Sequence, residues 1–349
     1  MRVGILYHTG GRQAISRNMK PRWIRFGIVP DGMLALDIAV PMGRTTVQSK
    51  AKNVTMFSGK GGVGKTTSAA ATALHHATTG KKTIIISTDF TPSLRDIFEL
   101  ECADKPARVT DNLYLDEINY TDVKALWEKK FGPQLYDVFS TFVDIGYEEF
   151  ADFVATILPG IRDEFMVDYI REISESGQFE SIVWDTAPAG QTLGLLRMPS
   201  LMNHHLKPAA RIYSSLKTTQ NMKRSVLGVI REWQELSDKD MDFLRKDVEF
   251  TIVTIAEALA VAQLEGIFAE FRGYGLSIDH LIVNQVVEGA DSPFLESKAQ
   301  TQQRYIADLK QRFDLKSTIL PLLPHEVKGI ERIREVERRL FASTSQWAG

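Results

Sequence analysis

The sequence has a single cysteine, Cys102, among its 349 residues. One thiol excludes a disulfide within the chain and any metal site built from cysteine pairs of one chain. No apolar run approaches the roughly 18 residues that a membrane-spanning helix requires. Composition shows no bias either: 44% hydrophobic and 25% charged residues are typical of a globular protein. The length accommodates one large α/β domain or two smaller ones.

The net charge of −2 is unevenly distributed along the chain. Residues 1–52 carry nine bases and two acids, whereas the remaining residues carry 33 bases and 42 acids. An acidic body argues against nucleic acid as a partner, because neutralising phosphates needs a cationic face. We expect residues 1–52 to be a leader or extension outside the main fold. This leader has three interpretations. It is an appendage, or sequence upstream of a later translation start at Met33 or Met42. Alternatively it is an organellar transit peptide, or a basic arm that contacts a membrane or a partner.

Short apolar runs rich in β-branched residues predict strands that are buried on both faces. Helical segments at 67–79 and 258–271, each followed by glycine, lie between such runs. This alternation predicts an α/β fold with a doubly wound, mostly parallel sheet. The expected strands are 53–57, 82–87, 181–184, 250–255, 280–283 and 318–320.

Two intervals between expected strands exceed the length of a simple crossover, which with its strands takes about 30 residues. Both intervals are mainly helical in character. We therefore expect a helical subdomain, inserted in the sheet domain of residues 53–349 and built from about 100–178 and 198–248.

Residues 58–67 read SGKGGVGKTT and satisfy the phosphate-loop pattern G-x-x-x-x-G-K-[ST]. Glycines let the backbone wrap around phosphates, and the following helix directs its positive end at them. Lys65 is expected to reach the β- and γ-phosphates of ATP, and the Thr66 hydroxyl to ligate Mg²⁺. The predicted nucleotide contacts are Gly59, Gly61, Gly62, Val63, Gly64, Lys65, Thr66 and Thr67.

The loop contains a second, earlier lysine, Lys60, and GKGGVGKT resembles a deviant Walker A motif. Five ordered blocks narrow this resemblance to the arsenical pump-driving and tail-anchored-protein targeting ATPases, and in particular to zinc-motif-lacking members of archaeal type. The resemblance covers about residues 53–340 and implies a P-loop NTPase. The blocks are 87–98, 185–193, 254–261, 282–285 and 321–327.

The resemblance implies a role for five further side chains. Lys60 would reach the nucleotide of a facing subunit and act as an arginine finger does. Asp89 would orient the attacking water, and Asp185 would sense Mg²⁺, through a water molecule. Asn284 corresponds to an adenine-reading asparagine, whose amide can both donate and accept. Glu257 corresponds to a glutamate at the base end of the nucleotide site.

The sequence departs from the family pattern at several positions. Phe90 replaces a proline after the switch aspartate, and Gln191 replaces a histidine, which affects the expected rate and coupling more than binding. Ser292 and Leu295 occupy the positions of the cysteines that clamp a dimer through zinc, so no zinc is expected. The cysteine-based metalloid site of the pump is missing as well.

Residues 138–170 carry more apolar side chains than one buried helix stripe requires. We interpret part of this surface as a groove for a hydrophobic client helix, as the resemblance also implies. The predicted groove residues are Phe150, Phe153, Val154, Ile157, Leu158, Ile161 and Phe165. The amphipathic segment 327–341 is expected to be a helix packed on the sheet rather than a membrane-surface helix.

The resulting hypothesis is a cytoplasmic, Mg²⁺-dependent ATPase that acts as a homodimer and delivers tail-anchored membrane proteins. The location would be organellar if the leader is a transit peptide. One alternative is the ATPase subunit of an arsenite or antimonite efflux pump, and another is a partitioning-type scaffold on DNA or membrane. A membrane receptor or a pump subunit is the expected further partner.

Overall fold

A computed structural model describes residues 26–28, 34–36, 52–89, 93–101, 105–140, 144–151, 159–215, 220–289 and 291–342. The chain divides into two compact units, Met1–Ser49 and Lys50–Gly349. In the first unit, β1 (Phe26–Ile28) pairs with β2 (Leu34–Leu36) as an antiparallel hairpin.

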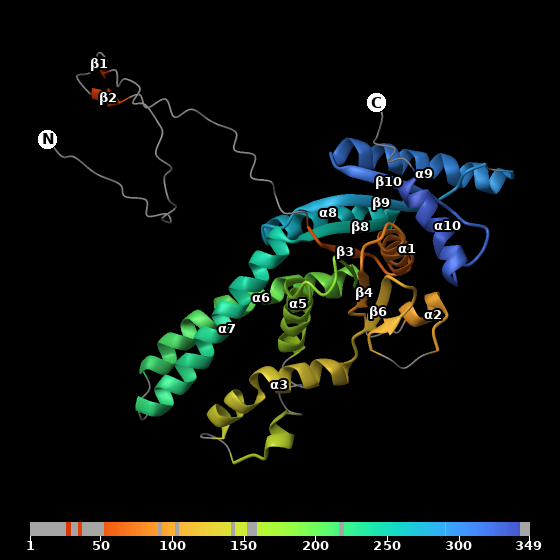
Figure 1. Cartoon of the computed structure of the whole chain (residues 1–349). Helices are drawn as coiled ribbons and strands as arrows, with labels where there is room; N and C mark the ends of the chain where they lie inside the picture. The colour runs from red at the N-terminus through yellow and green to blue at the C-terminus, as the bar shows by residue number, and fades with distance from the viewer. Residues whose placement is uncertain are drawn as a thin grey trace, which may run out of the picture. The chain divides into compact units, whose positions relative to one another are not determined.

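The second unit is built on an eight-stranded sheet with the order β10-β9-β8-β3-β7-β4-β6-β5 (Figure 1). Every pairing is parallel except that of β5 with β6. The predicted doubly wound, mostly parallel α/β fold is thereby confirmed. The strands are β3 (Val54–Gly59), β4 (Thr83–Ser87), β5 (Ala107–Arg108), β6 (Leu113–Glu117), β7 (Ser181–Asp185), β8 (Val248–Ile255), β9 (Ile278–Val286) and β10 (Lys316–Pro321).

All six expected strands are present, and the sequence reading missed β5 and β6. The interval from about residue 100, expected to be helical, therefore begins with two strands that extend the sheet, and its first long helix starts at Tyr120. The strand β6 reads LYLDE, in which polar and apolar residues mix, so it lacks the continuous apolar run that marks β4 and β7.

Successive side chains along each strand enter two different core layers, as the two-residue period of a strand requires. Phe57 and Val183 lie in the layer beneath α1 (Lys65–Thr78), α2 (Leu94–Phe98) and α10 (Ile330–Phe341). Met56 and Trp184 lie in the opposite layer. Alanines along α1 allow close packing, and α10 lies against α1 with Ile333, Val336 and Leu340 buried. The expected helix at 327–341 therefore packs on α1 and beside β10.

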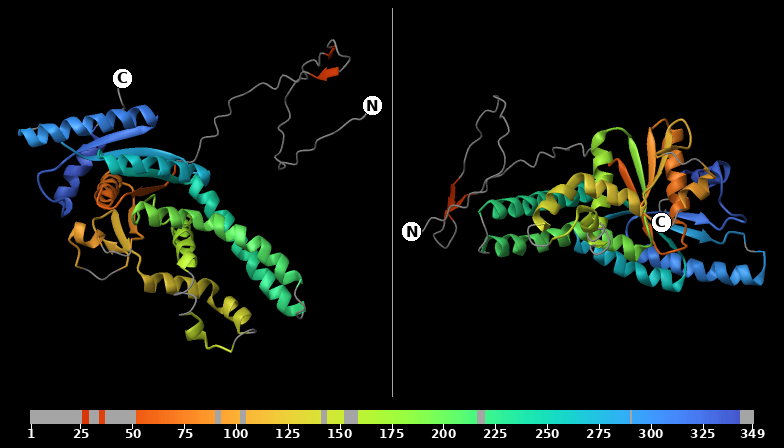
Figure 2. Two further views of the ribbon diagram at one scale, coloured as in Figure 1. Left: turned by 180° about the vertical axis from the view of Figure 1, so that it is seen from behind. Right: turned by 90° about the horizontal axis from the view of Figure 1, so that it is seen from below.

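The opposite layer is covered by α8 (Ala258–Gly273), α9 (Pro293–Arg312) and the helices of the predicted subdomain. These helices are α3 (Tyr120–Phe139), α5 (Pro159–Ser176), α6 (Ala189–Ser215) and α7 (Gln220–Lys246). In two views, α6 and α7 run side by side as a long pair that extends away from the sheet (Figures 1 and 2).

A buried ion-pair cluster ties three of these helices together. The guanidinium of Arg171 on α5 donates from Nε to Asp240 on α7 at 2.6 Å and also contacts Asp168. Lys130 on α3 donates to the same Asp168.

No helix within the described residues is both long and apolar enough to cross a membrane.

Candidate functional site

The predicted phosphate loop connects the end of β3 to the start of α1, at the carboxyl edge of the parallel strands. Two of its glycines are required by geometry. A Cβ at Gly59 would lie 2.1 Å from the carbonyl oxygen of Val253, and Gly64 has a φ of +94°. A Cβ at Gly64 would also lie 2.2 Å from Nδ2 of Asn284. No L-residue fits either place without moving the backbone, and this explains both outer glycines of the motif.

Lys65 begins α1 and is almost completely buried, at 7% exposure. Its Nζ donates a hydrogen bond to the carbonyl oxygen of Lys60 at 3.2 Å. Burial lowers the pKa of Lys65, whereas the nearby carboxylates of Asp185 and Asp89 act in the opposite direction. An ammonium held beside the N-terminus of α1 gives this loop a positive interior suited to phosphates.

Asp185, the last residue of β7, accepts a hydrogen bond from the Thr66 hydroxyl at 2.9 Å. Burial raises the pKa of this fully buried carboxyl to about 7, a shift opposed by Thr66 and Lys65 and assisted by Asp89. Its other oxygen, Oδ1, has no partner among the described residues. A hydroxyl and a carboxylate with a vacant acceptor are the hard oxygen groups that Mg²⁺ selects, so these two residues fit the predicted magnesium site.

Asp89 lies two residues beyond the end of β4, the neighbour of β7 in the sheet. Its backbone amide donates to the Ser87 hydroxyl at 3.2 Å, and the Thr88 amide donates to the Asp185 carbonyl at 3.1 Å. Because Ser87 and Asp185 are register partners, the two strands bring both predicted carboxylates to the same edge. The loop, Asp89 and Asp185 thus form one site.

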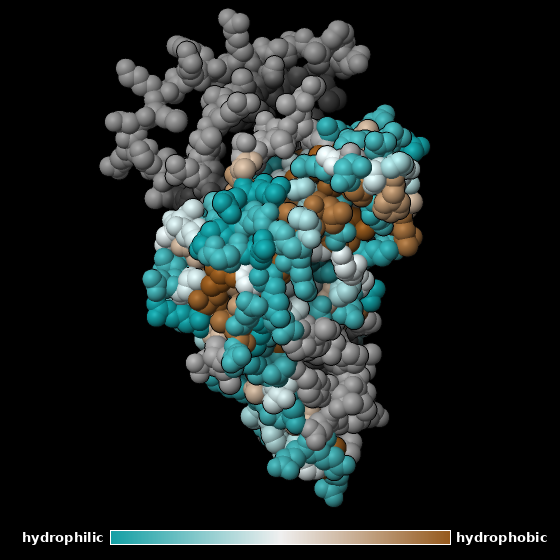
Figure 3. All heavy atoms as spheres, turned by 90° about the vertical axis from the view of Figure 1, so that its right-hand side faces the viewer, coloured by the Kyte–Doolittle hydropathy of each residue, from teal (hydrophilic) through white to brown (hydrophobic). Residues whose placement is uncertain are grey.

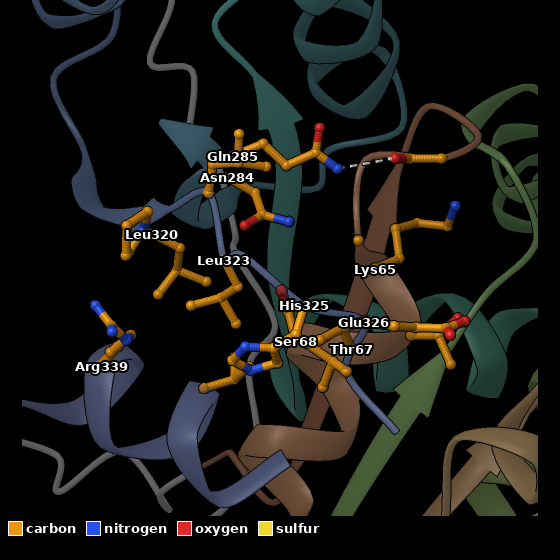
Figure 4. A pocket seen from close by; sticks show the side chains of 17 residues that line it. Lys65, Thr67, Ser68, Asn284, Gln285, Leu320, Leu323, His325, Glu326 and Arg339 are labelled. Atoms are coloured by element: carbon orange, nitrogen blue, oxygen red, sulfur yellow. Dashed lines mark hydrogen bonds between the residues drawn. The ribbon is translucent and has the colours of Figure 1, made fainter. Parts of the chain in front are cut away.

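The side chains that end β9 hold the phosphate loop from the opposite side. Nδ2 of Asn284 donates to the carbonyl oxygen of Val63 at 2.9 Å, and Nε2 of Gln285 donates to that of Gly62 at 3.5 Å (Figure 4). The predicted base-reading residue, Asn284, therefore lies at the loop, with its amide oxygen available.

A cavity of about 460 Å³ extends from this loop past Asn284 to α10. Its size is in the range of small-molecule sites, roughly 300–1,000 Å³. The far end is formed by residues that the sequence analysis did not assign to the site, which are Leu320, Pro321, Leu322, Leu323, His325, Glu326, Val327, Val336 and Arg339. The available signal for residues 320–327 was their position at the end of β10 and in the loop that follows it, because loops after parallel strands gather at the same edge.

Glu257, the predicted contact at the base end of the site, follows the end of β8. It precedes α8, its side chain is 54% exposed, and one of its oxygens is 3.8 Å from Nζ of Lys298. It does not belong to the residues that line the 460 Å³ cavity.

The predicted groove is described at its two ends. Phe150 and Phe165 are buried in the core layer that the subdomain shares with the sheet. The other groove residues, Phe153, Val154, Ile157 and Leu158, together with the side chain of Ile161, lie outside the described residues.

Ser292, at one of the positions where the family carries zinc-binding cysteines, caps α9. Its hydroxyl accepts a hydrogen bond from the Leu295 amide at 3.4 Å.

The side of the molecule shown in Figure 3 is mostly polar, with separate apolar patches between polar side chains.

Comparison with known proteins gives consistent similarities. Residues 52–342 match the ArsA_ATPase family model, described as anion-transporting ATPase. A putative arsenical pump-driving ATPase of Prosthecochloris vibrioformis is 28% identical over 308 residues, covering 82% of this chain and 75% of that protein. The ATPase get3 of Aspergillus terreus is 24% identical over 326 residues, covering 86% of this chain and 93% of that protein. Putative arsenical pump-driving ATPase 2 of Aquifex aeolicus is 25% identical over 299 residues, covering 82% of this chain and 98% of that protein.

Proposed function

The chain belongs to the ArsA_ATPase family and is an ATP hydrolase, and from this premise we propose that it is a Mg²⁺-dependent homodimer that delivers tail-anchored membrane proteins. The family membership confirms the resemblance found in the sequence motifs. The delivery function, the dimer and the site roles are the proposal.

In the proposed reaction, Asp89 accepts a hydrogen bond from the attacking water and orients it toward the γ-phosphate. Lys65 places its ammonium where charge accumulates on the transferred group, and the amides at the start of α1 hold the phosphates. Lys60 of the facing subunit would complete the site when the dimer closes. Thr66 and Asp185 would hold Mg²⁺, which would supply neutralisation of the phosphate charge.

The observation that favours a protein client over a metalloid is the cysteine count. A single cysteine, Cys102, leaves one chain without the thiolates that bind a soft metalloid ion. The long pair α6–α7 and the apolar 138–170 region supply a helical subdomain next to the ATP site. A groove across two such subdomains suits a hydrophobic helix. We place this activity in the cytoplasm, with a membrane receptor that accepts the client.

The test is capture of proteins by the purified chain with and without Mg-ATP, followed by mass spectrometry. The proposal predicts captured proteins that share a single C-terminal transmembrane helix. Charges introduced by Phe153→Asp and Ile157→Asp should abolish capture while ATP turnover persists. A matched control is Leu259→Asp, because Leu259 is 60% exposed and belongs to α8, outside the 138–170 region. Unchanged client capture by the groove variants would refute the groove.

Efflux of arsenite or antimonite is the second candidate, since several relatives are named as putative arsenical pump-driving ATPases. It predicts that antimonite stimulates ATP hydrolysis severalfold and that Cys102→Ser removes the stimulation. The tail-anchor proposal predicts no stimulation by antimonite in either protein.

A further inference from the structure

The two strands that end at the predicted catalytic carboxylates are joined by a buried side-chain hydrogen bond. The indole Nε1 of Trp184 donates to the Thr88 hydroxyl at 3.0 Å. Trp184 is fully buried and Thr88 is 4% exposed. Trp184 immediately precedes Asp185, and Thr88 immediately precedes Asp89.

Strand register explains why these two side chains meet. Ile86 of β4 pairs with Trp184 of β7, and side chains two residues apart share one face of a sheet. Thr88 therefore follows Ile86 onto the face that carries the indole. A second bond joins the same segments, because the Thr88 amide donates to the Asp185 carbonyl at 3.1 Å. Thr88 is thus held by its side chain and its backbone.

The indole ring lies in a core layer that the sheet shares with the helical subdomain. Trp184 belongs to the core layer that includes Met166 and Ile170 of α5 and Leu196 of α6. Rearrangement of these helices would move the ring, and with it the donor that holds Thr88. A buried hydrogen bond has few alternative partners, so its loss is not replaced by water.

We propose that Trp184 is a positioning residue that holds Thr88, and through it Asp89, in the place required for hydrolysis, and that it links packing of the helical subdomain to ATP turnover. The inference rests on the proposed role of Asp89. It adds a contact between two residues that are not among the predicted nucleotide contacts. It also gives the client-binding subdomain a physical route to the hydrolytic carboxylate.

The test compares ATP turnover by Trp184→Phe, Thr88→Val, the double variant and Thr88→Ser. Thr88→Val removes the acceptor at nearly constant volume and leaves the indole N–H unpaired. We expect kcat to fall about three- to tenfold, the effect of one buried hydrogen bond, with KM for ATP unchanged. The double variant should match Thr88→Val, because both changes remove the same bond, and Thr88→Ser should restore turnover.

Two controls separate positioning from loss of packing. Trp233→Phe removes a half-buried indole in α7 whose buried Nε1 has no partner among the described residues. Thr83→Val removes a fully buried hydroxyl at the opposite end of β4. Neither should change kcat once folding is verified by thermal melting.

Several results would overturn the inference: unchanged kcat in Trp184→Phe and Thr88→Val, losses that multiply in the double variant, or equal losses in the two controls. Asp89→Asn distinguishes failure of the inference from failure of the proposed site. If Asp89→Asn loses turnover and the Trp184 and Thr88 variants do not, the link alone is wrong. If Asp89→Asn retains full turnover, the site assignment is wrong.

Discussion

The Asp185 carboxyl is held in an environment that favours its protonated form in the absence of a cation. It is fully buried, and burial raises its pKa from an ordinary value of 3.8 to about 7. Binding of Mg²⁺ near this group requires the ionised form, since the cation and the proton compete for the same oxygens. The residue therefore links pH to both stability and nucleotide binding.

For the free protein, the folded chain binds an additional proton at Asp185 between pH 3.8 and about 7. The contribution of this group to the free energy of unfolding is therefore present at low pH and is lost as pH rises through about 7. Denaturant unfolding of the wild type at a series of pH values should show the free energy of unfolding falling as pH rises. The Asp185→Asn variant should lack the part of this fall that comes from Asp185. Burial also raises the pKa of Asp240 to about 7, so only the difference between the two proteins isolates Asp185.

Mg-ATP binding should depend on pH in the opposite direction. Affinity should weaken as pH falls from 8 to 6, because the proton on Asp185 must be displaced. Calorimetric titration of Mg-ATP at both pH values measures this. Equal affinities at both pH values would show that Asp185 does not take part in cation binding.

Asn284 is expected to select the base. Its Nδ2 already donates to the phosphate loop, so we expect the amide oxygen to accept a hydrogen bond from the adenine amino group. Asn284→Ala should weaken ATP binding about tenfold, equivalent to one buried hydrogen bond, and should reduce the preference for ATP over GTP. Competition binding with both nucleotides measures it, and a variant that keeps the wild-type preference would place base recognition elsewhere.

At the residue scale, the motifs located most of the site from the sequence. The loop glycines, Lys65, Thr66, Asp89, Asp185 and Asn284 come together at one edge of the sheet. The sequence could not place Arg339, because it reaches the cavity only through the packing of α10 on α1. The Trp184–Thr88 contact depends on register between strands that are far apart in sequence.

Among the elements, the central strands and the edge strand β10 were predictable, whereas β6 and β5 at the other side of the sheet were not. β4 and β7 are buried on both faces and read as continuous apolar runs. β5 has two residues and β6 is mixed in polarity, so neither gives a periodic signal. The subdomain helices were expected from the length and helical character of the two intervals between expected strands. These features predict that helices are present but not how they pack.

The ion-pair cluster of the subdomain should dominate its stability. Asp240 is fully buried and accepts a hydrogen bond from Nε of Arg171, whose side chain is 7% exposed. Asp240→Ala therefore leaves this buried guanidinium without the carboxylate that pairs with its Nε. We expect a loss of about 3–5 kcal/mol in the free energy of unfolding. Asp242→Ala on the same helix is the matched control, because the exposed pair with Lys246 contributes about 0–1 kcal/mol. Similar losses for both variants in denaturant unfolding would contradict the assigned role of the cluster.

On the scale of the whole molecule, the proposed catalytic residues lie in one of the two compact units. The loop, both carboxylates and Asn284 are all within Lys50–Gly349. A variant without residues 1–49 should therefore keep the wild-type kcat and KM for ATP. Steady-state hydrolysis by the two proteins measures this, and a large loss of turnover would assign the first unit a part in the site.

The assignment of ATP hydrolysis to Lys65, Asp185 and Asp89 is the claim on which the other proposals depend. Asp89→Asn tests it most directly, because the amide preserves the size of the side chain but lacks the negative charge that polarises the attacking water. ATP turnover and ATP affinity should be measured on the same preparation. The account predicts at least a hundredfold lower kcat with near wild-type affinity, in line with loss of a group that contributes roughly 10²–10⁴-fold. Turnover at the wild-type rate by a folded, ATP-binding Asp89→Asn protein would contradict it.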